Sequence, residues 1–305
     1  MESKLPRHFY HPKYWPVWLL IGAMWGLVRL PWPFQKWVAK GLGFLLYNLA
    51  GKRRNIVRKN LQMCFPEWNE EEQQKRVKDV FYHNALGMVE AFNAFNHPSE
   101  KFHSKVDIHG TELLEQAKAK GKGVILIGAH YSHLDFGAAL ISLVTDATVI
   151  YRPNNNPVMD HFILKGRQKI LKDVIPRDNM RAVIRALKND EVVWYPPDQD
   201  YGEKHSVYVP FFGVNAATIT ATSRLVKFND SPVLMLSYRR DDNSDRYTME
   251  FEAPPEGFPS GDDAKDAELI NQALERNIRK APTQYMWTHR RFKTQPDGKG
   301  NLYRS

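Results

Sequence analysis

The sequence places a histidine and an aspartate five residues apart, directly after a short apolar segment. His130 and Asp135 begin and end the stretch HYSHLD, which follows the apolar residues 124–127 (VILI). A histidine whose ring is held by a carboxylate through one nitrogen keeps the other nitrogen free to take a proton from a hydroxyl. The pair therefore predicts acid–base chemistry, with His130 as the general base and Asp135 as the carboxylate that orients it.

Spacing alone leaves a purely structural role for the two residues open. Side chains five positions apart on a regular helix point about 140° away from each other. His130 and Asp135 can meet only if His130 lies before a helix and Asp135 lies in its first turn. The prediction therefore depends on the elements on either side of the motif.

Those elements indicate an α/β sheet. Residues 124–127 are typical of a strand buried on both faces, and residues 134–144 have the length and composition of a helix. Open α/β sheets bind their ligands at the carboxyl ends of such strands. We therefore expect the HYSHLD motif to lie at the ligand-binding edge of a sheet.

Two further strands deliver polar residues to the same edge. The predicted strand 148–151 is followed by RPNNNPVMD, and Arg167 lies in the helix that we expect to begin at residue 157. The predicted strand 191–195 is followed by PPDQDYG, which contains Asp198. Three strands that converge in this way are stronger support for an active site than one His–Asp spacing.

Strands and helices alternate over most of the chain, which predicts one α/β domain with a mixed, mainly parallel sheet and flanking helices. The other expected strands are 106–108, 233–238 and 247–252, the last two joined as a hairpin. The other expected helices are 70–95, 111–120, 180–188, 217–228 and 264–280.

Charge is concentrated at the two ends of the chain. The net charge is +9, and residues 1–60 hold eleven Lys or Arg side chains against one acid. No zinc-finger or RRM-type motif accompanies these basic residues, so we expect no nucleic-acid partner. They alternate with apolar, Trp-rich runs, which favours an anionic membrane surface as the partner.

Residues 14–28 form the first of these apolar runs, with fifteen residues and no charge. This is short of the ~20 residues that cross a bilayer comfortably. Three alternatives stay open, namely a short or tilted span, a helix in the membrane interface, and a helix packed on the soluble part. We expect a membrane-associated N-terminal helix and divide the chain into an anchoring segment, 1–50, and a catalytic domain, 51–305.

The sequence offers few other means of catalysis. Cys64 is the single cysteine, which rules out an internal disulfide and a Cys-based zinc cluster and reads as a small buried hydrophobe. No Gly-x-Ser-x-Gly segment is present to supply a serine nucleophile. We expect neither a metal nor a cofactor.

Seven segments together carry a family resemblance. They are HPKYW (11–15), NLQMCFPE (60–67), HYSHLD (130–135), YRPNNNP (151–157), EVVWYPPDQDYG (191–202), VPFFG (209–213) and APTQYMWTHRRFKT (281–294). With these motifs the chain resembles the late acyltransferases of lipid A biosynthesis, the Kdo2-lipid IVA lauroyl and palmitoleoyl transferases of Gram-negative bacteria. The matching segments run nearly from end to end.

The resemblance implies a glycerolipid-acyltransferase-like fold and a reaction. A fatty acyl chain, expected to be lauroyl, moves from acyl-[acyl-carrier-protein] to a hydroxyl on a hydroxyacyl chain of Kdo2-lipid IVA, by direct attack in a ternary complex. It also implies an enzyme at the inner membrane, with its catalytic domain facing the cytoplasm.

The resemblance further implies roles for particular residues. His130 and Asp135 are the catalytic pair, and the family's functionally important arginine and aspartate correspond to Arg167 and Asp198. Arg167 suits a thioester oxyanion or a substrate phosphate, and a structural ion pair with Asp198 or Asp160 is its alternative. The expected contacts to the substrate headgroup are Arg152, Asn154 and Asn156.

Two other functions remain open. A glycerol-phosphate-type acyltransferase shares the His-x4-Asp motif and takes a smaller acceptor, but the motifs outside the catalytic pair disfavour it. A membrane scaffold without activity would need no base at His130.

Overall fold

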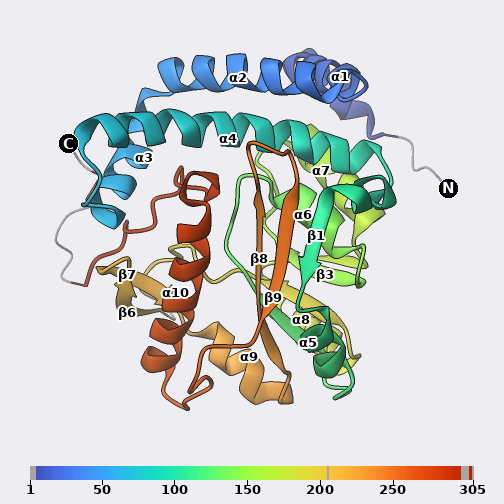
Figure 1. The fold of residues 1–305 in the computed structure, drawn as a ribbon. Helices are drawn as coiled ribbons and strands as arrows, with labels where there is room; N and C mark the ends of the chain where they lie inside the picture. The colour runs from blue at the N-terminus through green and yellow to red at the C-terminus, as the bar shows by residue number, and fades with distance from the viewer. Residues whose placement is uncertain (1–4, 205, 297–301, 304–305) are drawn as a thin grey trace.

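The computed structural model describes residues 5–204, 206–296 and 302–303. Its helices are α1 (Trp15–Leu27), α2 (Trp32–Leu49), α3 (Gly51–Cys64), α4 (Glu70–Asn96), α5 (Thr111–Lys118), α6 (Leu134–Ile141), α7 (Pro157–Ile170), α8 (Met180–Lys188), α9 (Ala221–Asn229) and α10 (Asp263–Lys280). Its strands are β1 (Val106–His109), β2 (Val124–Ile127), β3 (Ala147–Tyr151), β4 (Asp173–Pro176), β5 (Val192–Tyr195), β6 (Ser206–Phe211), β7 (Val214–Ile219), β8 (Val233–Arg240) and β9 (Tyr247–Glu252). Figure 1 shows their arrangement.

The main sheet has seven strands in the order β1-β9-β8-β2-β5-β3-β4. The strands β8, β2, β5, β3 and β4 run parallel to one another, and β9 pairs antiparallel with β8 and parallel with β1. The predicted mixed, mainly parallel sheet with flanking helices is confirmed. The predicted hairpin is also present, as β8 and β9.

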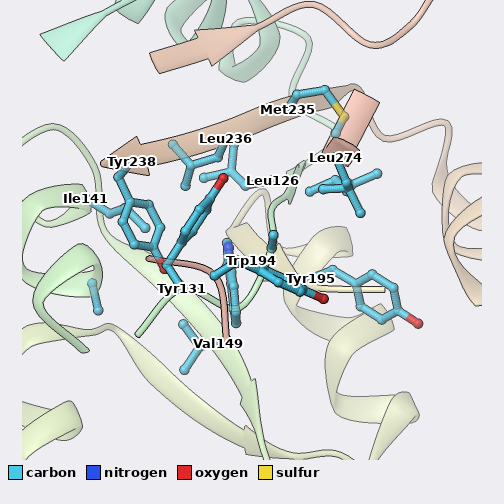
Figure 2. Close-up of a cluster of buried hydrophobic side chains, with 14 of the residues drawn as sticks. Leu126, Tyr131, Ile141, Val149, Trp194, Tyr195, Met235, Leu236, Tyr238 and Leu274 are labelled. Carbon is cyan, nitrogen blue, oxygen red and sulfur yellow. The ribbon is translucent and has the colours of Figure 1, made fainter. Parts of the chain in front are cut away.

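Two central strands, β2 and β5, form the centre of the core because their side chains are apolar on both faces. All four residues of β2 and all four of β5 are buried. Figure 2 shows part of this core, where Leu126 of β2 and Leu236 of β8 lie near the rings of Tyr131, Trp194 and Tyr238. The strand ends that carry the motif residues are therefore held by a rigid apolar layer.

The N-terminal helices α1 and α2 pack on α4, which lies between them and the sheet (Figure 1). A buried amide contact joins the layers, because Asn93 of α4 donates from Nδ2 to Oε1 of Gln35 on α2 (2.7 Å). Gln35 in turn donates to the carbonyl of Leu30, in the turn before α2 (2.7 Å). In the described part of the chain, no helix combines the length and the apolarity that a bilayer crossing needs.

Three strands of the structure were not predicted from the sequence. β4 is a four-residue strand at the sheet edge, and β6 with β7 forms a separate two-stranded ribbon. The ribbon turns through Phe212 and Gly213, both with positive φ (53° and 75°). Two consecutive positive φ values are the signature of a type I′ hairpin, but phenylalanine is a rare first residue there, so the turn was not recognised.

The segment after α10 closes over the sheet edge. Arg291 is buried and donates to the Ala217 carbonyl and to Oγ1 of Thr218 on β7 (2.7 and 2.8 Å). Thr294 donates from its backbone N–H and its hydroxyl to the carboxylate of Asp200, just beyond β5 (2.7 and 2.8 Å). These contacts fix the segment across the ends of the strands that carry the motif residues.

Candidate active site

His130 follows β2 by three residues, and its backbone is fixed on two sides. The His130 carbonyl accepts a hydrogen bond from the backbone N–H of Met286 (2.9 Å). Two residues later, the backbone N–H of Ser132 donates to the Gln284 carbonyl (2.8 Å). On the opposite side the backbone of α4 approaches so closely that a Cβ on Gly87 would lie 2.0 Å from the Ser132 oxygen. The chain around His130 therefore has little freedom to move.

Asp198 follows β5 by the same number of residues. Ile127 and Tyr195 are register partners in the parallel pair β2–β5, so positions 130 and 198 come to the same height at the sheet edge. The Asp198 carboxylate accepts from the His130 ring Nδ1 (2.6 Å) with one oxygen and from the His130 backbone N–H (2.9 Å) with the other. Strand register, rather than proximity in sequence, brings this pair together.

Asp198 is ionised over the whole physiological pH range. Complete burial acts to raise the pKa of Asp198, but the charge of His130 and the hydrogen bonds from its ring and backbone outweigh it and lower the pKa to about 2. A carboxylate can only accept, so Nδ1 of His130 must carry a proton. The lone pair of His130 is then on Nε2.

The predicted contact between His130 and Asp135 is wrong. Oδ1 of Asp135 instead accepts from Nε of Arg167 on α7 (2.6 Å). Asp135 does lie in the first turn of α6, as expected, but its carboxylate is used to join α6 to α7. Both partners are largely buried, with 18% and 17% of their side chains exposed.

Arg167 does form the ion pair that was the alternative to a role in catalysis, but with a different partner from those expected. The acidic partner is Asp135, and not Asp198 or Asp160. Burial acts to lower the pKa of Arg167, but the adjacent Asp135 carboxylate raises it overall. A fixed guanidinium that stays charged suits the binding of an oxyanion or a phosphate.

The His130 ring reaches the protein surface between two other rings. Its side chain is 16% exposed, the Trp194 ring packs edge-on against it at 5.6 Å, and the His289 ring lies at 6.3 Å. Within the described residues, Nε2 of His130 makes no hydrogen bond. The proton-accepting nitrogen is therefore available to a molecule that binds at this edge.

His289 is a neighbour of His130 that no sequence pattern indicated. The His289 residue is exposed at the surface, but partial desolvation by nearby protein atoms and the positive charges of His130, Arg53 and Arg152 outweigh the Asp198 carboxylate and lower the pKa of His289 to about 4. The ring is therefore neutral at pH 7. Position 289 lies within the segment 281–294 that carries the family resemblance, but nothing in its local pattern indicated that it faces His130.

The three predicted substrate contacts lie in the loop between β3 and α7. Oδ1 of Asn156 caps α7 by accepting from the N–H groups of Val158 and Met159 (3.1 and 3.2 Å). Oδ1 of Asn154 accepts from the Asn156 N–H (2.9 Å) and so shapes the loop. Contact of either asparagine with substrate remains a prediction.

Arg152 differs from the two asparagines because it is exposed and its charge acts on His289. It thus belongs to the electrostatic surroundings of the His130 edge. Among the described residues, no group of three or more His, Cys, Asp or Glu side chains has an arrangement that could hold a metal ion.

An oriented imidazole with a free nitrogen, at the carboxyl edge of a mixed α/β sheet, defines a candidate acid–base catalyst. The buried Asp198 carboxylate fixes the tautomer of His130. The charged guanidinium of Arg167 lies on α7, the helix that follows β3, and is held by Asp135.

Comparison with known proteins supplies the family. Residues 2–294 match the model of the bacterial lipid A biosynthesis acyltransferases. The chain is 38% identical to the lipid A biosynthesis lauroyltransferase of Escherichia coli (strain K12) over 295 residues, which cover 96% of each protein. It is 35% identical to the palmitoleoyltransferase of the same strain over 303 residues, 99% of each.

A lipid A biosynthesis acyltransferase of Haemophilus influenzae is also 35% identical, over 305 residues that cover 98% of this chain and 97% of the relative. The chain therefore belongs to the bacterial lipid A biosynthesis acyltransferases. The family and the enzyme class predicted from the seven motifs are confirmed.

Proposed function

We propose that the protein transfers a fatty acyl chain, lauroyl in the first instance, from acyl-[acyl-carrier-protein] to a hydroxyl on a hydroxyacyl chain of Kdo2-lipid IVA. The observation that carries the mechanism is the hydrogen bond between Nδ1 of His130 and the buried Asp198 carboxylate. The lauroyltransferase relative at 38% identity supports the acyl group, and the family supports a lipid A-type acceptor.

The proposed reaction is direct attack. Nε2 of His130 takes the proton of the acceptor hydroxyl as its oxygen bonds to the thioester carbonyl carbon. The C–S bond then breaks, and the protonated His130 returns the proton to the leaving thiolate. Asp198 stabilises the imidazolium between these steps, and it remains ionised because its pKa is about 2.

Arg167 is proposed to stabilise negative charge in this reaction. Its Nε is occupied by Asp135, which leaves the two terminal nitrogens of the guanidinium to face an oxyanion or a substrate phosphate. Arg152 is proposed to bind the acceptor headgroup, for which its exposure and positive charge are suitable. Asn154 and Asn156 then act through their side-chain amide nitrogens, because their oxygens are engaged in the loop.

The activity test uses purified protein, acyl-carrier thioester and each of two acceptors. We expect transfer to Kdo2-lipid IVA and not to glycerol 3-phosphate. His130→Ala should lower the rate by ~10²-fold or more, because the general base is lost. Undiminished activity of this variant would remove the proposed base, and preference for glycerol 3-phosphate would favour the smaller-acceptor alternative.

We further propose that the protein docks on the cytoplasmic surface of the inner membrane through α1 and α2. The outward sides of these helices expose large apolar side chains, among them Leu19 (74%), Trp37 (68%) and Phe44 (72%). Exposed lysines, including Lys40 and Lys52, lie on α2 and at the start of α3. Apolar insertion combined with cationic attraction is the usual way in which interfacial helices bind anionic bilayers.

Docking is tested by sedimentation with vesicles that contain anionic lipid. The double change Leu19→Ser and Phe44→Ser should reduce the bound fraction several-fold, because it removes inserted apolar area. Phe228→Ser is the matched control, since Phe228 is an exposed aromatic residue (52%) on α9, outside the proposed face. Equal loss of binding in the control would argue against the assigned face.

A further inference from the structure

A second cleft lies between α3 and the first half of α4, away from His130. It has a volume of about 950 Å³. Its lining includes Tyr47, Arg54, Arg58, Trp68, Glu70 and Gln73. None of these residues belongs to the proposed catalytic site, and Asn60, which binds the carbonyls of Trp287 and His289, points from another face of α3.

One side of the cleft is cationic. Arg54 and Arg58 lie one turn apart on α3, and their guanidinium groups donate to neutral oxygens, the Tyr47 carbonyl (2.8 Å) and Oδ1 of Asn55 (3.0 Å). The Arg54 guanidinium also lies over the Tyr47 ring, 5.0 Å from its centre. Gly51 adds the N-terminus of α3, whose N-cap residue supplies no side-chain hydrogen bond. These groups together favour a bound phosphate.

The other side of the cleft offers acceptors. Gln73 is only 6% exposed, and its Nε2 donates to the carbonyls of Leu61 and Phe65 (3.4 and 2.9 Å). This fixes its Oε1, which has no hydrogen-bond partner in the described part of the chain. A buried acceptor without a partner is costly, so a ligand of this cleft is expected to bring a donor.

One more residue on this side favours a cationic donor. Glu70, one turn before Gln73, contributes a carboxylate to the lining. Trp68 also lines the cleft, but its ring is already engaged, because it stacks on Phe65 at 4.1 Å and carries the Arg76 guanidinium 5.3 Å from its centre. A carboxylate and an amide oxygen are groups that bind ammonium ions.

We propose that this cleft binds the phosphoethanolamine headgroup of a membrane phospholipid. The phosphodiester lies on Arg54 and Arg58, and the ammonium group lies on Gln73 and Glu70. A zwitterion fits better than a simple anion because cationic and anionic side chains line the same cleft.

The position of the cleft favours a lipid as the source of this headgroup. Tyr47 and Gly51 place it at the C-terminal end of α2, where Phe44, Leu45 and Leu49 are exposed. The acyl chains of a bound lipid can therefore follow the apolar side of α2. The inference rests on the proposed docking of that face on a membrane, and it adds a specific lipid to it.

The test uses dihexanoylphosphatidylethanolamine below its micelle concentration, titrated calorimetrically into the full-length protein. A soluble lipid makes the result independent of whether the protein binds bilayers. We expect one molecule per chain, and Arg58→Gln should weaken binding by about 10-fold, because a charge-assisted hydrogen bond is lost. Lys52→Gln, an equal charge change on α3 outside the cleft, should weaken it by less than about 2-fold.

Other ligands test the proposed phosphate site and the proposed ammonium site separately. Dihexanoylphosphatidylglycerol should bind at least about 5-fold more weakly, and Glu70→Gln should remove most of this preference. Equal affinity of the wild-type protein for the two lipids would overturn the ammonium assignment, as would displacement of the lipid by inorganic phosphate at similar concentration. If Arg58→Gln weakened binding of the acidic carrier protein and not of the lipid, the cleft would be a protein-docking site and the proposal would be wrong.

Discussion

At the scale of single residues, an ionised carboxylate and a neutral imidazole lie beside the proposed base. Asp198 compensates the charge that His130 gains during the reaction, and His289 adds no second positive charge because its pKa is about 4. A neutral imidazole 6.3 Å from His130 can hydrogen-bond a substrate without repelling the imidazolium.

The protonation of His289 can be measured by NMR titration of isotope-labelled histidine rings, with His289→Gln used to assign its signal. We expect this signal to stay at its neutral position from pH 8 to about pH 5 and to titrate near pH 4. The reason is that the protonated form is disfavoured by desolvation and by nearby cations. A midpoint near 6.5, the value of an unperturbed histidine, would contradict the described surroundings.

Sequence patterns were sufficient to bring four candidate residues to one sheet edge but not to pair them. His130, Asp135, Arg167 and Asp198 were all expected at one sheet edge, and the structure brings them there as two pairs. Which carboxylate meets His130 depends on the register of β2 and β5, a contact between positions 68 residues apart. Local spacing favours the nearer acid, and it contains no information about that register.

At the scale of elements, glycines allow helices to approach the motif. Gly87 of α4 faces the backbone of Ser132, and an added Cβ would come within 2.0 Å of its carbonyl oxygen. Gly87→Ala should therefore force apart α4 and the turn that follows His130. We expect a loss of about 1–3 kcal/mol in the free energy of unfolding, with a large fall in kcat.

Gly41→Ala is the control for this prediction. Gly41 lies within α2 and a Cβ there meets no atom within 4 Å. Alanine should then be neutral or stabilise the protein by about 0.5–1 kcal/mol, because glycine is the poorer helix former. Urea unfolding and steady-state kinetics measure both variants, and equal behaviour of the two would show that the α4 contact is unimportant.

Elements with strong local signals were predictable, and those defined by long-range contacts were not. Runs such as residues 124–127 are rich in apolar and β-branched side chains and become β2. The edge strand β4 and the ribbon of β6 and β7 depend instead on pairing partners and on an atypical turn at Phe212. The seven motifs marked the ribbon as part of the family pattern without indicating its conformation.

At the scale of the whole molecule, a buried polar cluster joins α4 to the sheet beneath the motif. Glu90 and His83 of α4 both contact Arg240 of β8. Nη1 of Arg240 donates to Oε1 of Glu90 (2.5 Å), and Nη2 lies 2.7 Å from Nδ1 of His83. His133, from the motif itself, is completely buried, and its ring nitrogens have no hydrogen-bond partner among the described residues. This cluster was not predictable from the sequence because its members are far apart in the chain.

The cluster should make the protein sensitive to acid. Burial, and then the charge of Arg240, lower the pKa of His133 well below 6.5, and the pKa of His83 is lowered for the same reasons. As the pH falls below about 6.5, these two histidines become protonated in the unfolded chain but stay neutral in the folded chain. The free energy of unfolding therefore decreases as the pH is lowered. Each histidine adds up to about 1.4 kcal/mol per pH unit to this slope.

Replacement of His133 by Phe tests whether this histidine makes the folded protein less stable at low pH. The slope of the unfolding free energy between pH 6.5 and 5 should become shallower by up to about 1.4 kcal/mol per pH unit. The matched control is His109→Phe, the same change at an exposed position of β1. Urea unfolding at several pH values provides the measurement, and an unchanged slope in the His133 variant would show that the folded chain binds the His133 proton as readily as the unfolded chain does.

The central claim is that His130 and Asp198 act as one unit and that Asp135 acts separately through Arg167. A double-mutant cycle on kcat tests it most directly, since residues of one catalytic unit are strongly non-additive. Asp198→Asn alone should cost ~10²-fold or more, but in the His130→Ala background less than about 3-fold. Asp135→Asn should cost about the same factor in both backgrounds. The opposite result would contradict this claim. In that case Asp135→Asn would not change kcat in the His130→Ala background, and Asp198→Asn would lower kcat by the same factor in both backgrounds.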